Sequence, residues 1–307
     1  MTTESPSALP ASTKSDILLE ALPYIRQFRD KVVVVKYGGN AMVDPSLARA
    51  FADDIVLMRS VGMLPVVVHG GGPQIGELMD RLGKKPEFRD GLRVTDAETL
   101  DIARMVLVGK INRDIVSSIN VHGPIAVGLS GEDAGLILAS ARNPDLGFVG
   151  DVEAVNPGII LRLLAEGLVP VVSTIGADVA GQAYNINADT VAGAIAVALE
   201  AEKVVYLTDV EGLLADVDDP DTLIRRITPA DVQHLLDDGT LTGGMIPKVA
   251  ACVHAATHGV RSAHMINGTT PHVLLLEIFT DEGIGTMVSD HPPVTDPLDI
   301  PDEELTP

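Results

Sequence analysis

The chain has 307 residues, of which 46% are hydrophobic and only 3% aromatic, and its formal net charge is −21. A chain of this length buries a large core, as one big domain or as two closely joined lobes. The negative charge argues against a nucleic-acid surface or an anionic membrane as partner, because both require basic patches. The single cysteine, Cys252, excludes an intrachain disulfide and fits a reducing cytosol. We expect neither a signal peptide nor a membrane span, and therefore a cytoplasmic protein.

The N-terminal part predicts a tail followed by a helical arm. Residues 1–14 are rich in Ser, Thr and Pro and should form a disordered tail. Ser15 can cap a helix over residues 15–30, which Pro23 should kink or interrupt. The apolar positions that share one face of this helix are Leu18, Leu22 and Ile25. Because a membrane-surface helix requires a basic polar face, an arm that packs on another subunit or on the body fits better.

The body alternates between apolar runs and helical patterns. The apolar runs with strand character are Val32–Val35, Leu64–Val68, Ile125–Val127, Val169–Val172, Val204–Leu207 and Val273–Ile278. The helical patterns include Leu47–Val61, Ala97–Asn120 and Thr190–Leu199. Runs that are apolar on both faces and separated by helices predict an α/β protein with a mostly parallel sheet sandwiched between helices. Residues 290–307, rich in proline and acids, should form a second disordered tail.

Two glycine turns follow the first two predicted strands. Gly38 and Gly39 come after Lys36, at the carboxyl end of a strand, where open α/β sheets place ligands. The second turn, His69–Gly72, is followed by Pro73, a favourable first residue of a helix. Backbone N–H groups at both turns can approach an anion closely. The turns therefore predict a phosphate or carboxylate site, although Lys36 also fits as a surface lysine before an ordinary turn.

Other glycine-rich motifs match the sequence less well. Gly70, Gly72 and Gly76 are spaced one residue too far apart for the dinucleotide-binding fingerprint. The oxyanion hole of lipase-like hydrolases requires a G-x-S-x-G elbow, and the nearest match, Gly128–Glu132, ends in glutamate. A Walker loop is absent from the sequence. The histidines lack metal-ligand spacing, so we expect no metal ion held by protein side chains.

Four polar residues lie near predicted helix starts. Arg93 can clamp a substrate carboxylate with two parallel hydrogen bonds, although it also fits as an exposed arginine. Asn187 or Asp189 can cap a helix, and Asp189 could also orient lysines. Lys248 lies at a helix N-terminus, against the macrodipole, which favours a function over the alternative of an exposed first-turn lysine.

Jointly, these motifs resemble the amino acid kinase superfamily, and within it the N-acetylglutamate kinases. The matching segments, in the family's order, are Lys36–Met42, His69–Gln74, Gly91–Thr95, Asn185–Asp189 and Gly244–Lys248. The resemblance covers roughly residues 16–289 and implies one three-layer α/β/α sandwich over 31–289. Its N-terminal lobe, about 31–200, would bind the acyl amino acid, and its C-terminal lobe, about 201–289, would bind ATP.

The implied reaction is the ATP-dependent phosphorylation of the side-chain carboxylate of N-acetyl-L-glutamate to N-acetyl-L-glutamyl 5-phosphate, in L-arginine biosynthesis. The implied site residues are Lys36, Lys248, Asp189 and Gly39 for catalysis, Gly71, Gly72, Arg93 and Asn185 for the substrate, and Thr208 and Asp209 for the nucleotide. Both lysines would neutralise charge on the transferring phosphoryl group, with Asp189 orienting them. Backbone N–H groups of Gly39 and Gly72 would hold its oxygens, and Mg²⁺ would be held mainly by the ATP phosphates.

A second resemblance concerns control. In arginine-inhibited members an N-terminal helix links dimers into a hexameric ring, and Glu20–Ile25 is similar to that helix. The segment Glu277–Thr286 is similar to their inhibitor site, which implies feedback by L-arginine and a hexamer built as a trimer of dimers. Glu277 would receive the guanidinium, although it also fits as an ordinary acid at the edge of a strand. The other implied arginine contacts are Tyr24, Lys203, His264 and Gly283.

One departure and two rival functions remain. Glu132 and Ala134 stand where lysine and glycine are frequent in the family, which leaves the role of Asp133 open. One rival is another amino acid kinase, acting on glutamate, aspartate, carbamate or a nucleoside monophosphate. The other is a catalytically silent arginine sensor. Arg93 and the segment Asn185–Asp189 favour the acetylated acceptor, and the presence of both lysines and the aspartate argues against a silent sensor.

Overall fold

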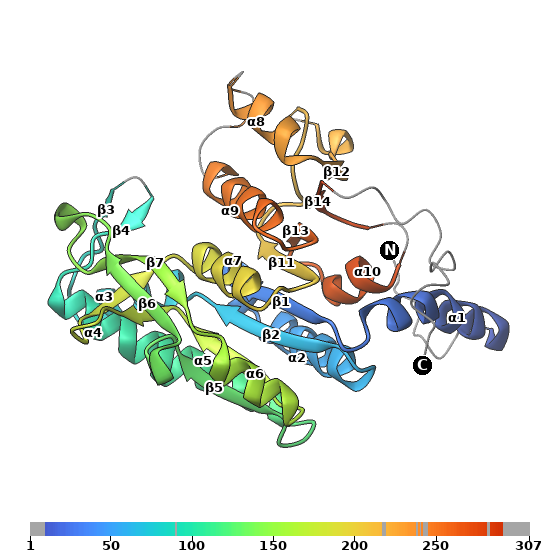
Figure 1. Ribbon diagram of the computed structural model, residues 1–307, viewed down its shortest axis with the longest axis horizontal. Coiled ribbons are helices and arrows are strands. Elements are labelled where there is room, and N and C mark those ends of the chain that lie inside the picture. Colours follow the sequence, from blue (N-terminus) through green and yellow to red (C-terminus); the bar gives the residue numbers. More distant parts are fainter. Residues whose placement is uncertain are drawn as a thin grey trace.

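An eight-stranded sheet forms the centre of the molecule, with strand order β12-β14-β13-β11-β1-β2-β8-β5 (Figure 1). The computed structural model describes residues 10–89, 91–216, 219–237, 239, 241, 245–280 and 283–290. Every neighbouring pair in this sheet is parallel except β13 and β14. The strands are β1 (Val32–Tyr37), β2 (Leu64–His69), β5 (Ala126–Ser130), β8 (Val169–Ser173), β11 (Lys203–Thr208), β12 (Arg226–Ile227), β13 (Ser262–Asn267) and β14 (Thr286–Val288).

Two smaller sheets lie beside the large one. Four strands close on one another: β6 (Ile137–Ala141), β7 (Val149–Val155), β9 (Ile175–Ala177) and β10 (Ala183–Ile186). A short hairpin pairs β3 (Phe88–Arg89) with β4 (Leu92–Arg93). The short helical turns are η2 (Gly39–Met42), η4 (Asp133–Gly135), η5 (Pro144–Leu146) and η6 (Pro220–Thr222).

Helices cover both faces of the large sheet (Figure 1). They are α1 (Ala11–Phe28), α2 (Pro45–Ser60), α3 (Gly72–Arg81), α4 (Ala97–Arg104), α5 (Asn112–Asn120), α6 (Gly158–Ala165), α7 (Ala188–Ala198), α8 (Pro229–Asp237), α9 (Met245–Thr257) and α10 (Val273–Phe279). Successive residues of β1 point to opposite faces, so Val33 and Val35 enter one core while Val34 enters the other. This arrangement confirms the predicted α/β/α sandwich with a mostly parallel sheet.

The predicted helical pattern over Ala97–Asn120 is one continuous helical run of three parts. It consists of α4, a π-helical segment η3 (Met105–Ile111) and α5. The π-helical part was not predicted, because its wider turn leaves no distinct mark in a pattern of apolar residues. Segments of this kind are frequent at functional sites, and η3 lies against the second glycine turn.

The prediction of a strand over Val273–Ile278 is wrong, because this run forms helix α10. Its inward-facing residues follow a helical spacing: Val273, Leu274, Glu277 and Ile278 are buried, whereas Leu276 is exposed. A run this short and apolar does not separate a strand from a buried helix by its pattern. The strand of this region is β13 (Ser262–Asn267), whose polar residues hide its character in the sequence.

The N-terminal helix begins earlier than predicted, at Ala11 instead of Ser15. The Ser15 hydroxyl donates a hydrogen bond to the Ala11 carbonyl, 3.1 Å away, as a mid-helix serine does, and caps nothing. The helix also continues through Pro23, which does not interrupt it. Of the two predicted tails, residues 1–9 and 291–307 lie outside the described residues.

Candidate active site

The carboxyl end of β1 meets the start of α7 through an ion pair. The Lys36 ammonium lies 3.0 Å from a carboxylate oxygen of Asp189, and both side chains are about nine-tenths shielded from solvent. Asn187 caps α7, because its side-chain oxygen accepts hydrogen bonds from the N–H groups of Asp189 and Thr190. The cap therefore falls to Asn187, which leaves the Asp189 carboxylate for the lysine.

The second glycine turn presents unused donors. Among the described residues, the N–H groups of Gly71 and Gly72 donate to no protein acceptor, and both residues line a cavity. A side chain at Gly71 would collide with the π-helical segment, because its Cβ would lie 2.3 Å from Ile111 Cδ1 and 2.7 Å from Leu107 Cδ2. At Gly72 a Cβ would meet nothing within 4 Å. Free N–H groups at the start of a helix attract phosphate or carboxylate groups.

The first turn brings in an acid from a distant strand. Gly39 has φ +69°, a backbone conformation that favours glycine, and a Cβ there would lie 2.7 Å from Asp209 Oδ1. Asp209, which follows β11, therefore reaches the first turn. Thr208 lies beside it, but its hydroxyl is buried and bonded to backbone, with the Val210 carbonyl oxygen 2.8 Å away.

One cavity of about 240 Å³ gathers the expected acceptor residues. It is lined by both glycine turns, by the β3–β4 hairpin and by the segment that leads into α7. The predicted site residues among its lining are Lys36, Gly39, Gly71, Gly72, Arg93, Asn185 and Asp189. These residues come from four separate parts of the sequence, and the fold brings them to one edge of the sheet, at the carboxyl ends of β1 and β2.

Arg93 is held in place from three sides. It donates to the Gly72 carbonyl at 2.8 Å and to the Met79 sulfur at 3.3 Å, and its guanidinium lies 4.7 Å from the centre of the Phe88 ring. Burial lowers the pKa of this guanidinium, which nevertheless stays charged. Opposite it, the Asn185 amide makes a long contact of 3.5 Å with the Thr95 hydroxyl. A fixed cation and a weakly engaged amide suit recognition of a small anionic acceptor.

Lys248 is the predicted residue that the structure sets apart. It lies half-buried on the first turn of α9, and within the described ranges it forms no ion pair with Asp189. The resemblance implies that Asp189 orients both lysines, and the structure places its carboxylate against Lys36. Lys248 and Asp189 still lie within electrostatic reach of the same thiol, Cys252, whose pKa burial raises well above its usual value. Gly244, which precedes this helix, lies outside the described residues.

A second and larger cavity adjoins the first. Its volume is about 770 Å³, and the two cavities share Gly91, Leu92, Asn187 and Asp189. On its far side lie Pro247 and His254 of α9, the helix that carries Lys248. A ligand in each cavity would therefore meet its neighbour at Asp189, where the Lys36 ammonium is already held.

The residues predicted to form a regulatory site also converge, beneath α10. His264 Nδ1 donates to Glu277 Oε1 at 2.5 Å, and the Ile284 N–H donates to Glu277 Oε2 at 2.9 Å. Burial lowers the pKa of His264 to about 4, so its ring is neutral at neutral pH. Burial alone would raise the pKa of Glu277, but the hydrogen bond from His264 and the charge of Lys203 bring it below its usual value.

The N-terminal helix closes this cluster from one side. The Lys203 ammonium lies 4.9 Å from the centre of the Phe28 ring, at the end of α1, and α1 packs against α10 (Figure 1). Tyr24, one turn earlier, packs on the same hydrophobic core. Gly283 faces the acid, since a Cβ there would lie 3.8 Å from Glu277 Oε2.

The segment that departs from the family pattern has a structural explanation. Asp133 Oδ2 accepts a hydrogen bond from the Ser130 N–H at 2.7 Å, so this carboxylate holds a turn after β5. Ala134 has φ +54°, a left-handed conformation that costs a non-glycine residue energy. Glu132 pairs with Arg104 at 2.9 Å, on the exposed side of the turn.

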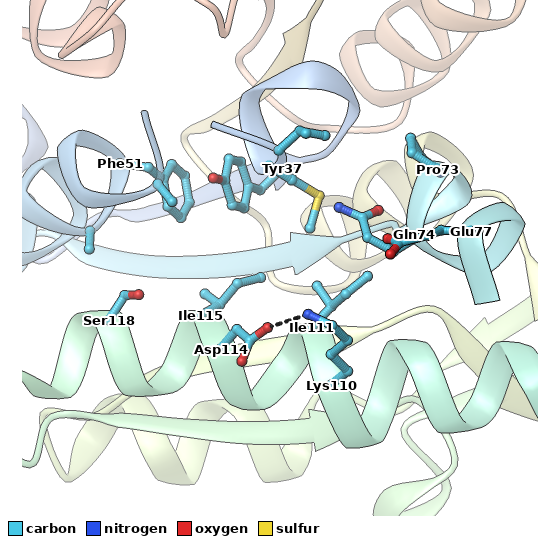
Figure 2. Close-up of a pocket in the computed structure, with 14 residues that line it drawn as sticks. Tyr37, Phe51, Pro73, Gln74, Glu77, Lys110, Ile111, Asp114, Ile115 and Ser118 are labelled. Carbon is cyan, nitrogen blue, oxygen red and sulfur yellow. Dashed lines mark hydrogen bonds and ion pairs between the residues drawn. The ribbon is translucent and has the colours of Figure 1, made fainter. Parts of the chain in front are cut away.

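Two features were missed at the level of sequence. One is a cavity of about 310 Å³ between α2, α3 and α5, beside the stacked rings of Tyr37 and Phe51 (Figure 2). The other is a buried contact between His69 Nε2 and Asn112 Nδ2, 3.2 Å apart, behind the second glycine turn. Asn112 was visible in the sequence as a polar residue on the apolar face of a helix, but nothing local indicated its partner.

Comparison with known proteins assigns the chain to a family. A protein-family model, described as "Amino acid kinase family", matches residues 31–267. The chain belongs to the amino acid kinase family. It is 56% identical to the acetylglutamate kinase of Symbiobacterium thermophilum, over 91% of this chain and 98% of that relative. It is 52% identical to the acetylglutamate kinase of Methanocaldococcus jannaschii, over 90% of this chain and 96% of that one.

Solved structures share its fold. The N-acetylglutamate synthase of Neisseria gonorrhoeae, complexed with coenzyme A and N-acetyl-glutamate, superimposes with a TM-score of 0.80 at 25% identity. The match covers 91% of this chain and 64% of that longer one. The carbamate kinase of Giardia lamblia bound to AMP-PNP has a TM-score of 0.64 at 18% identity, covering 85% and 99% of the two chains, and supports the fold alone. In the described part of this chain, no helix has both the length and the apolar character to cross a membrane.

Proposed function

We propose that this amino acid kinase is an ATP-dependent N-acetylglutamate kinase, which forms N-acetyl-L-glutamyl 5-phosphate in arginine biosynthesis. The observation that carries the proposal is the shielded Lys36–Asp189 pair, 3.0 Å apart, in a cavity that also holds two unused N–H groups and Arg93. The relatives at more than half identity, whose printed name is acetylglutamate kinase, support the choice of acceptor.

The acceptor is assigned to the smaller cavity. Arg93 binds its α-carboxylate, the Asn185 amide binds the acetylamino group, and the side-chain carboxylate points toward Lys36. That carboxylate is ionised at neutral pH and already nucleophilic, so no strong general base is required. The work of the protein is then to hold two anions close together and to neutralise the charge that develops between them.

The phosphoryl group is assigned to the region between the two turns. Lys36 and the N–H groups of Gly39 and Gly72 hold its oxygens, while Asp189 keeps the Lys36 ammonium in place. ATP supplies the phosphoryl group, and Mg²⁺ bound to its phosphates would lower their charge. In the described ranges no three His, Cys, Asp or Glu side chains gather as a metal site, so we assign Mg²⁺ to the nucleotide. Lys248, on the side of the larger cavity, is assigned to the same phosphoryl group.

The product provides a direct test of this chemistry. An acyl phosphate reacts with hydroxylamine to give a hydroxamate, whereas a phosphate ester does not. The proposal predicts hydroxamate from N-acetyl-L-glutamate, Mg-ATP and this protein, and none when the side-chain carboxylate is replaced by an amide. Hydrolysis of ATP without hydroxamate would contradict it.

Feedback by L-arginine is the second part of the proposal. The observation that supports it is the convergence of Lys203, His264, Glu277 and Gly283 beneath α10. A buried carboxylate that already receives two donors still has lone pairs for a guanidinium. Because α1 closes the same cluster, a ligand there would act on the N-terminal helix. Binding of arginine by calorimetry, together with loss of turnover, tests this part.

The third part assigns α1 to assembly into a hexamer, as a trimer of dimers. Leu18 and Leu22 lie one turn apart on the same face of α1 and are 72% and 40% exposed, so they form an exposed apolar strip. Leu18→Asp would charge this strip without touching the core of the subunit. The proposal predicts that the wild-type chain has the mass of a hexamer in light scattering and that Leu18→Asp has that of a dimer. A hexamer that survives the substitution would exclude this role of α1.

A further inference from the structure

A fully buried histidine ends strand β2 immediately before the second glycine turn. His69 has no exposed surface, and both of its ring nitrogens have partners. Nδ1 lies 3.0 Å from the carbonyl oxygen of Gly70, and Nε2 lies 3.2 Å from the Asn112 amide nitrogen. Because a carbonyl only accepts, Nδ1 carries the proton, and Nε2 accepts from the amide of Asn112. Burial lowers the pKa of His69 to about 4, so this arrangement holds at neutral pH.

The partner of His69 is itself fixed. Asn112 is fully buried at the start of α5, and its amide also donates to the Val171 carbonyl at 2.8 Å, in the strand next to β2. Its side-chain oxygen accepts from Arg113. Gly128 on β5 leaves room for this pair, since a Cβ there would lie 1.8 Å from the Asn112 oxygen. The sheet therefore anchors Asn112, and through it the ring of His69.

The hydrogen bond from His69 acts on one peptide group. Across a trans peptide the C=O of Gly70 and the N–H of Gly71 point in opposite directions, and the described chain contains no cis peptide bond. With its carbonyl held on the side of the His69 ring, this peptide directs the Gly71 N–H away from the ring, and Gly71 lines the acceptor cavity. Three successive glycines would otherwise let the peptide turn over at little cost.

We propose that His69 and Asn112 are positioning residues for phosphoryl transfer, which hold the Gly70–Gly71 peptide with its N–H directed into the acceptor cavity. Neither residue touches the substrate. The inference rests on the proposed function for its kinetic readout, and it adds residues that act through the backbone of the turn. The π-helical segment contributes to this arrangement, because Leu107 and Ile111 lie against Gly71 and belong to the same helical run as Asn112.

Two variants of one residue separate positioning from packing. His69→Asn keeps an amide N–H near the place of Nδ1 and so retains a donor for the Gly70 carbonyl. His69→Gln places its amide near Nε2 and loses that donor, although its volume is closer to that of histidine. We expect His69→Gln to lower kcat/KM for N-acetyl-L-glutamate on the order of 10²-fold, with KM for ATP unchanged, and His69→Asn to lose less than about tenfold. Equal losses in both variants, or full activity in His69→Gln, would overturn the proposal.

A spectroscopic readout on the wild-type chain covers the case in which a variant fails to fold. With ¹⁵N-labelled histidine, two of the eight rings are expected to be neutral, protonated at Nδ1 and unchanged between about pH 8 and about pH 5: that of His69, and that of His264, which donates to Glu277. The His69→Asn spectrum lacks one of these two signals and so assigns it to His69. A His69 ring protonated at Nε2 alone would overturn the proposal, because it has no proton for Gly70. This result is independent of turnover, whereas wild-type protein without activity on N-acetyl-L-glutamate would refute the proposed function instead.

Discussion

The Lys36 ammonium and the Asp189 carboxylate lie 3.0 Å apart, and they join the first strand of the sheet to a helix that begins about 150 residues later. Both side chains are shielded, so the pair is screened by solvent far less than a surface ion pair. Because Asn187 caps the helix, the carboxylate of Asp189 is left to orient the lysine. We regard this pair as the centre of the site.

Removing the Asp189 carboxylate should slow phosphoryl transfer far more than it weakens substrate binding. In Asp189→Asn the Lys36 ammonium loses its anchor, and we expect kcat with Mg-ATP and N-acetyl-L-glutamate to fall on the order of 10²-fold. The matched control is Asp114→Asn, which breaks a pair with Lys110 of the same 3.0 Å length in which both side chains are about two-thirds exposed. The control should keep wild-type kcat. Equal effects of the two substitutions would argue against the role of Asp189.

The buried His69 predicts a loss of stability in acid. Its pKa is about 4 in the folded protein and 6.5 in the unfolded chain, so the unfolded state binds the proton more readily. The stability it contributes is present above about pH 6.5 and is lost as the pH falls toward about 4. Between about pH 7 and about pH 5 this single group should lower the free energy of unfolding by on the order of 2 kcal/mol.

Urea unfolding of the wild type and of His69→Asn at both pH values measures this loss. Asparagine does not titrate, so the variant should lose less stability on acidification by that amount. The buried His264, whose pKa is also lowered to about 4, causes the same loss of stability in both proteins. Its effect therefore cancels when the wild type and His69→Asn are compared. If the free energy of unfolding fell by the same amount in both proteins between the two pH values, His69 would not be held neutral in the folded state.

Local pattern predicted the centre of the sheet well but not its C-terminal edge. Strands β1, β2, β8 and β11 are apolar on both faces, because helices cover both sides, and such runs stand out in the sequence. The run Val273–Ile278 looks equally apolar, yet its contacts with α1 and α2 select a helix. In β13 the buried side chains of Ser262 and His264 satisfy one another, which a pattern of apolar residues cannot reveal.

Ala134 offers a test of the departure from the family pattern. It adopts φ +54°, where glycine lacks the steric cost of a Cβ, and it precedes a glycine in the same left-handed region. We expect Ala134→Gly to raise the free energy of unfolding by about 0.5–1 kcal/mol, after the larger entropy loss of glycine is subtracted. The unfolding midpoint in urea measures this change. Ala139→Gly, at a buried strand position, should instead destabilise the protein, and a loss of stability in both would refute strain at Ala134.

Arginine inhibition should depend on the acid beneath α10. Glu277→Gln keeps the shape of the side chain but removes the charge that would receive a guanidinium, so we expect the arginine concentration for half inhibition to rise at least about tenfold. Activity without arginine should stay near that of the wild type, and exposed Glu153→Gln should keep normal inhibition. If Glu277→Gln were inhibited as strongly as the wild type, arginine would bind elsewhere.

The candidate site was predictable in its parts but not in its contacts. The glycine turns and Lys36 stand at strand ends, and Arg93 and Asp189 belong to segments that resemble a known family. Neither source predicted that, among the described residues, the Asp189 carboxylate pairs with Lys36 and not with Lys248, since Lys248 lies on a helix from a distant part of the chain. The His69–Asn112 contact was equally hidden, because it joins residues 43 positions apart through the interior.

Release of ADP, measured with Mg-ATP and a panel of acceptors in the presence and absence of L-arginine, tests the proposed reaction and its feedback in one assay. The panel contains N-acetyl-L-glutamate, glutamate, aspartate and carbamate. We predict turnover with N-acetyl-L-glutamate alone, suppressed by arginine. Turnover with another acceptor would contradict the assigned substrate, and arginine binding without turnover on any acceptor would identify the protein as a silent sensor.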